Sequence, residues 1–155
     1  MKKLMTFSSI FLSMLIFVCV LHILSTDKRN ARKSIRFIFR PLIIDISTSV
    51  TILHYKDERL VKKDTIEDNE EFLRMFPYAL YRYVLRKEKP TDISPKLTDY
   101  VRVELENDIS TYVVDFPTNE PSYNFAKFTD IERERMSIYY LSRRGQQKIR
   151  FFFEK

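Results

Sequence analysis

The chain has 155 residues, the size of one ordinary domain, and its 45% apolar and 31% charged residues are typical of a folded protein. Its single glycine excludes glycine-rich phosphate loops, and its single cysteine excludes disulfide frameworks and cysteine-based zinc sites. The net charge of +6 is uneven along the chain. Residues 41–155 hold 19 Lys or Arg against 20 Asp or Glu, so this part is nearly neutral and we expect no nucleic-acid binding.

An uncharged run of 21 residues, from Leu4 to Leu24, is the strongest signal in the sequence. As a helix it would be about 31 Å long, enough to cross the hydrocarbon layer of a membrane. No small-residue cleavage site follows the run, so we interpret residues 1–26 as the uncleaved anchor of a single-pass membrane protein, with cleavage as the alternative.

The orientation of this anchor depends on two opposed signals. Lys2 and Lys3 form the basic head of an export signal, which favours a domain outside the cytoplasm. The basic residues after the span favour the reverse, because positive loops stay inside. We expect an extracytoplasmic domain, and the cytoplasmic orientation stays open.

Residues 27–47 form a basic juxtamembrane segment with six Lys or Arg and no acid between residues 28 and 40. Five of these cations share one helical face, and we expect them to contact anionic lipid headgroups: Arg29, Arg32, Lys33, Arg36 and Arg40. Apolar residues gather on another face: Ile35, Ile38, Phe39 and Leu42. The same residues also alternate as a strand would, so helix and strand both remain open for residues 30–42.

Residues 48–155 are expected to form the folded domain. Alternating apolar residues predict a hairpin from strands at 50–55 and 60–66. Asp68 is the expected cap of a helix that reaches Val84, with an apolar stripe that continues through Pro77. A second hairpin, at 100–106 and 109–116, is expected to turn at Asn107 and Asp108. That two-residue turn places Leu105 opposite Ser110, Val103 opposite Tyr112 and Val101 opposite Val114.

Sequence patterns in the last part of the chain predict a short strand at 125–128, a helix and a final strand. Thr129 to Glu132 read as a capping box, so a helix is expected from Thr129 to Arg144, ended by Gly145 in a left-handed conformation. Alternation in residues 148–153 predicts the last strand. This order of elements predicts an α+β fold, a mostly antiparallel sheet with two helices packed on it.

No catalytic motif, metal site or cofactor site is predicted. His54 is the only histidine outside the span, and a single imidazole lacks the second ligand of a histidine-based metal site. The acidic clusters at 67–71 and 130–134 fall in the first turns of expected helices, where they complement the helix dipole. Tyr78, Arg82 and Arg86 are expected on one outer helical face as a candidate binding patch.

These features predict a membrane-tethered, non-catalytic interaction or accessory domain. Its expected partners are anionic lipid headgroups and another membrane or envelope protein. The alternative is a membrane-bound hydrolase or ligand-processing domain, which would have to gather His54 with a carboxylate from a distant segment, such as Asp115 or Glu104.

Overall fold

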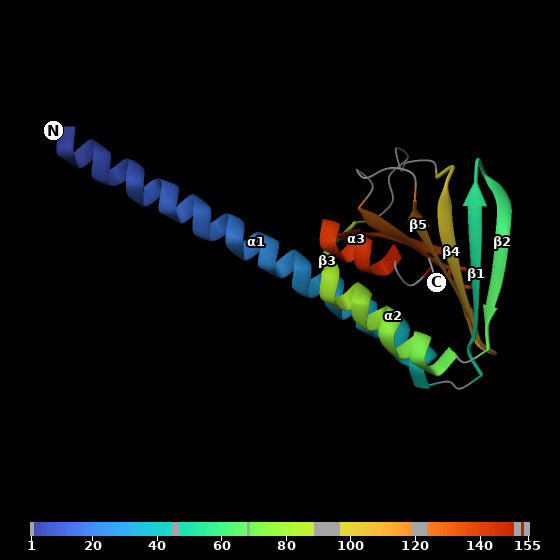
Figure 1. Cartoon of the computed structure of the whole chain (residues 1–155). Coiled ribbons are helices and arrows are strands. Elements are labelled where there is room, and N and C mark those ends of the chain that lie inside the picture. Colours follow the sequence, from blue (N-terminus) through green and yellow to red (C-terminus); the bar gives the residue numbers. More distant parts are fainter. Residues whose placement is uncertain are drawn as a thin grey trace.

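The computed structural model describes residues 2–44, 47–67, 69–88, 97–118, 124–150 and 153, and the side chains of residues 10–40 and 42 within the first helix. A long helix leads into a seven-stranded antiparallel sheet with two further helices (Figure 1). The chain order is α1 (Lys2–Ile44), β1 (Ser49–Lys56), β2 (Arg59–Ile66), α2 (Asn69–Tyr83), β3 (Val84–Glu88), β4 (Tyr100–Glu106), β5 (Thr111–Pro117), β6 (Phe125–Asp130), β7 (Arg135–Leu141) and α3 (Arg143–Arg150). The strand order in the sheet is β2-β1-β4-β5-β6-β7-β3, which confirms the predicted α+β class.

Helix α1 is continuous over 43 residues, about 65 Å at the usual helical rise. Its side chains from Ile10 to Leu24 are all exposed, and this part is long and apolar enough to cross a membrane. Farther along, four apolar side chains are at most 1% exposed: Ala31, Ile35, Phe39 and Leu42. Residues 30–42 are therefore helical, and their apolar face belongs to the core of the domain rather than to the membrane surface.

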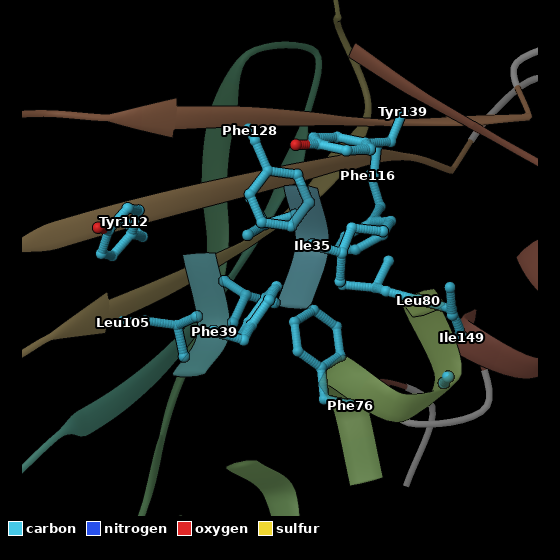
Figure 2. Packing of buried hydrophobic residues seen from close by; sticks show 14 of the residues in the cluster. Ile35, Phe39, Phe76, Leu80, Leu105, Tyr112, Phe116, Phe128, Tyr139 and Ile149 are labelled. Carbon is cyan, nitrogen blue, oxygen red and sulfur yellow. The ribbon is translucent and has the colours of Figure 1, made fainter. Parts of the chain in front are cut away.

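The core lies between one face of the sheet and the helices, and aromatic rings dominate its centre (Figure 2). The Phe39 ring meets Phe76 of α2 and Phe128 of β6 edge to face, with centroid distances of 6.0 and 5.5 Å. Tyr139 of β7 is fully buried, and its hydroxyl lies 2.7 Å from the Ser34 hydroxyl. Helix α1 is thus joined to the sheet by both apolar and polar contacts.

The first predicted hairpin is confirmed. Strands β1 and β2 are joined at Asp57 and Glu58, whose φ angles are 49° and 62°. Two successive positive φ values make a mirror-image turn, which matches the natural twist of a two-stranded ribbon. The backbone amides of both residues are satisfied, by the Asp99 carboxylate and the Thr98 carbonyl respectively. Thr98 and Asp99, directly before β4, thereby stabilise a turn that contains neither Gly nor Asn.

The second hairpin exists, but its predicted register is wrong by two residues. The structure pairs Leu105 with Tyr112, Val103 with Val114 and Val101 with Phe116. The turn is longer than predicted because the Asn107 side-chain oxygen accepts hydrogen bonds from the amides of Ile109 and Ser110. A shift by two residues preserves the faces of a strand, so the predicted core-facing residues still face the core.

Helix α2 follows the predicted stripe, with Phe72, Leu73, Phe76 and Leu80 buried and Pro77 inside one helix. The predicted cap, Asp68, lies outside the described residues.

The predicted helix from Thr129 to Arg144 is wrong. Thr129 lies inside strand β6, which ends at Asp130; a turn with Glu134 at φ 49° follows, and residues 135–141 form strand β7. Glu132 does not cap a helix, because its carboxylate accepts a hydrogen bond of 2.6 Å from the amide of Thr111. β7 instead lies between β6 and β3, where it pairs with both neighbours, and this pairing overrides the local capping signal.

The predicted last strand is also wrong, because residues 143–150 form helix α3. Gly145 does not end a helix in a left-handed conformation; it lies within α3, and its φ is not positive. A Cβ built at Gly145 would overlap the Cβ and Cγ of Tyr83. The only glycine of the chain therefore permits the close packing of α3 against the end of α2.

We expect Phe39→Ala to destabilise the domain by about 3 to 5 kcal/mol, because it leaves a cavity between α1, α2 and the sheet. The matched control is Phe37→Ala on the same helix, since Phe37 is 74% exposed. Unfolding of the detergent-solubilised chain measures both. Equal losses of stability would contradict the role of α1 as a core helix.

Gly145→Ala should lower stability by about 1 to 3 kcal/mol, since the added methyl group forces α3 away from Tyr83. Gln147→Ala, at an exposed position of α3, is the control and should be nearly neutral. The unfolding temperatures of the two variants test this. An unchanged temperature for Gly145→Ala would mean that the two helices separate without cost.

Candidate anion-binding groove between helices α1 and α2

Helix α2 runs antiparallel to the second half of α1, with its last turn nearest the apolar span (Figure 1). The Arg32 guanidinium donates hydrogen bonds to the backbone carbonyls of Tyr81 (3.1 Å) and Arg82 (3.2 Å). These carbonyls belong to the C-terminal turn of α2, which has no intrahelical donors for them and carries the negative end of the helix dipole. Arg32 therefore has a structural role in ending α2.

Two adjoining hollows of about 510 and 540 Å³ follow the seam between the two helices, and both are lined by Arg36 and Tyr81. Together they form the basic groove. The remaining lining residues of the first hollow are Ser25, Lys28, Arg29, Arg32 and Lys33, and those of the second are Ile35, Phe39, Arg40, Arg74, Pro77 and Tyr78. The groove thus contains seven cationic side chains and no acidic one among its described lining residues.

The cations of the groove have no counter-ion within the described part of the chain, where none of them makes an ion pair. The Arg32 and Arg36 guanidiniums lie over the Tyr81 ring, at 5.1 and 5.4 Å from its centroid. Stacking on an aromatic face orients a guanidinium without using its hydrogen-bond donors. No described residue accepts a hydrogen bond from Arg36, which leaves its donors directed to a ligand.

The predicted binding patch is only partly assembled. Tyr78 is exposed on α2 and lines the groove. Arg82 lies over the Tyr83 ring at 5.8 Å. The sequence predicted Arg86 on the same helical face as Tyr78 and Arg82. This is wrong, because α2 ends at Tyr83. Arg86 lies on β3, over the Tyr140 ring, and pairs with Glu88 at 3.1 Å.

The binding patch predicted from the sequence left out Arg74 and Tyr81, which line the groove. Arg74, Tyr78 and Tyr81 are spaced i, i+4, i+7, so the helical pattern places them on one face of α2. What the sequence could not supply was the neighbour of that face, since residues 28–40 and 74–81 meet only through tertiary packing.

His54 lies near the C-terminal end of β1, on the core-facing side of the sheet, and not near the acids proposed for it. Its side chain is on the same face of the sheet as Ile52. Glu104 lies opposite Thr51, and Asp115 lies opposite Arg102, so both acids are on the other face. Asp115 is 3% exposed and accepts two hydrogen bonds from Arg102, of 2.7 and 3.1 Å. The structure therefore does not bring His54 together with Asp115 or Glu104, the carboxylates named as examples for the alternative hydrolase.

The electrostatic surroundings of His54 favour its neutral form. Burial lowers its pKa below the ordinary value, and Lys62 lowers it further, against the opposing effect of Asp64. The Asp64 carboxylate is 3.9 Å from His54 Nε2 but only 2.7 Å from the ammonium of Lys62. Within the described residues no group of three or more His, Cys, Asp or Glu side chains could hold a metal ion.

The chemistry of the basic groove suits an anion with several oxygen atoms. Guanidinium groups bind phosphate and carboxylate through paired hydrogen bonds, and lysines add charge without fixed geometry. The groove starts at Ser25, directly after the apolar run. No protein-family model, curated protein or solved structure matches this chain.

Arg32→Gln should reduce the stability of the domain by about 1 to 2 kcal/mol, because two carbonyls at the end of α2 lose a charged donor. Lys33→Gln removes the same charge from an exposed neighbour and should leave stability unchanged. Unfolding in a neutral detergent separates the two. A similar effect of both variants would show that Arg32 acts only through its charge.

Proposed function

We propose that this chain is a single-pass membrane protein whose domain is a non-catalytic interaction or accessory module held against anionic lipid headgroups. The observation that carries the proposal is the continuity of α1, whose side chains from Ile10 to Leu24 are exposed and mostly apolar and whose second half is a wall of the core. Ala31, the first buried residue after Leu24, is about 10 Å along the helix from it, so no flexible linker separates the domain from the proposed bilayer surface.

The cations of the groove differ in their distance from the proposed membrane. Lys28 and Arg29 lie about 6 to 8 Å beyond Leu24 along the helix axis, which is the depth of the headgroup layer. Lys33 follows at about 14 Å and Arg40 at about 24 Å. Charges are screened over about 8 Å at physiological salt, so the first cations contribute most of the attraction and Arg40 little.

The proposed orientation places the domain outside the cytoplasm, as supported by the Lys2–Lys3 head of the span. A protein partner in the membrane or envelope fits an accessory role, since the rigid connection fixes which surfaces of the domain can meet a neighbour beside the bilayer.

The anchor and its orientation can be tested with one introduced cysteine, because the chain has only one cysteine of its own to remove. In a Cys19→Ala background, Lys63→Cys places a thiol on the exposed strand β2. We expect a membrane-impermeant maleimide to label this thiol in intact cells. We also expect the protein to remain with membranes in alkaline carbonate. Labelling only after permeabilisation would mean that the domain is cytoplasmic, and release by carbonate would refute the anchor.

Contact with headgroups can be tested on the full chain in nanodiscs of phosphatidylcholine with and without phosphatidylglycerol. We expect phosphatidylglycerol to raise the unfolding temperature of the domain, less so at high salt. The triple variant Lys28→Gln, Arg29→Gln, Lys33→Gln should lose this rise. The double variant Arg40→Gln, Arg74→Gln, in the second hollow, should keep it. A rise that survives the triple variant would contradict the proposed contact.

A further inference from the structure

A second cavity, of about 360 Å³, lies where the ends of β1, β4 and β5 meet helix α3. We call it the sheet-end cavity. Its walls are largely apolar and include Val101, Phe116, Ile149 and Phe153, of which Phe116 and Ile149 are labelled in Figure 2. His54, Lys56, Tyr100 and Arg150 also line it. An apolar hollow with a few convergent polar groups is the usual form of a small-molecule site.

Arg150 is the polar group of this cavity whose bonding is incomplete. One terminal nitrogen, Nη2, donates a hydrogen bond of 2.7 Å to the carbonyl of Thr118. Its Nε is buried and has no hydrogen-bond partner, and Arg150 makes no ion pair in the described part of the chain. A buried donor without an acceptor is unfavourable, so an acceptor placed in the cavity beside Arg150 would gain a hydrogen bond.

The charges around the cavity favour an anion as that acceptor. Lys56 is exposed at the rim and, like Arg150, has no ion pair with any described residue. The Asp99 carboxylate, which also lines the cavity, accepts the amide of Asp57 in the β1–β2 turn. His54 Nε2 is likewise buried without a hydrogen bond. Two cations thus face one carboxylate that already has a structural partner.

We propose that the sheet-end cavity binds a small amphipathic anion, an aryl or alkyl carboxylate. Its apolar group lies against the side chains of Phe116, Ile149 and Phe153, and its carboxylate accepts hydrogen bonds from the guanidinium of Arg150. Lys56 adds attraction at the rim. This site is separate from the basic groove and does not depend on the function proposed for that groove.

Fluorine NMR of para-fluorophenylacetate tests the proposal on the full chain in phosphatidylcholine nanodiscs. We expect saturable line broadening beyond that caused by empty nanodiscs. The neutral amide of the same compound should bind about tenfold more weakly or worse, because it cannot form a charge-assisted bond with Arg150. No broadening beyond empty nanodiscs, or equal affinity for acid and amide, would overturn the proposal.

Arg150→Gln should weaken binding of the acid by about tenfold or more. Arg144→Gln, which removes the same charge from an exposed position of α3, should bind as the unchanged chain does. Lys56→Gln should weaken binding by a smaller factor, and it leaves the bond between Arg150 and Thr118 intact. Equal affinity of the Arg150→Gln and Arg144→Gln variants would mean that the carboxylate is held elsewhere.

Discussion

The burial of Phe39 and its neighbours on α1 is the interaction on which the rest of the structure depends. These side chains occupy the centre of the core, between Phe76 of α2 and Phe128 of the sheet, so the domain cannot complete its apolar interior without this helix. The same helix continues without a break into the exposed apolar run that ends at Leu24. One continuous helix therefore combines a stripe that is buried in the core with a run that is long and apolar enough to cross a membrane.

This constraint also creates the basic groove. When the apolar stripe of α1 packs inward, the adjacent cationic stripe is brought beside α2, where Arg32 binds the carbonyls at the end of that helix and Arg36 stacks on Tyr81. The remaining cations are concentrated along a single seam that begins at the end of the apolar run. A basic segment on a flexible linker would spread its charge, whereas a packed helix fixes both the direction and the spacing of each guanidinium.

On the opposite face of the sheet, the main cation is paired with a carboxylate. There Arg102 forms a bidentate pair with the buried Asp115, and its guanidinium lies over the stacked rings of Tyr55 and Tyr100. The hydrogen bond with Asp115 raises the pKa of Arg102, so this cation is firmly held in its charged form and already neutralised. The arginine side chains of the groove and Arg150 have no such carboxylate among the described residues, and this difference separates structural charge from charge available to a ligand.

The sequence alone determined the long apolar helix, the class of fold, the first hairpin and the stripe of α2, because each depends on local periodicity or on a continuous apolar run. Tertiary structure decided the helix of residues 30–42, since helix and strand patterns were equally good until the sheet offered a face to cover. It also decided strand β7, whose neighbours in the sheet overrode the capping signal at Thr129, and helix α3, whose Gly145 packs against Tyr83 at the end of α2. The basic groove and the sheet-end cavity each join segments distant in the chain, and only packing brings such segments together.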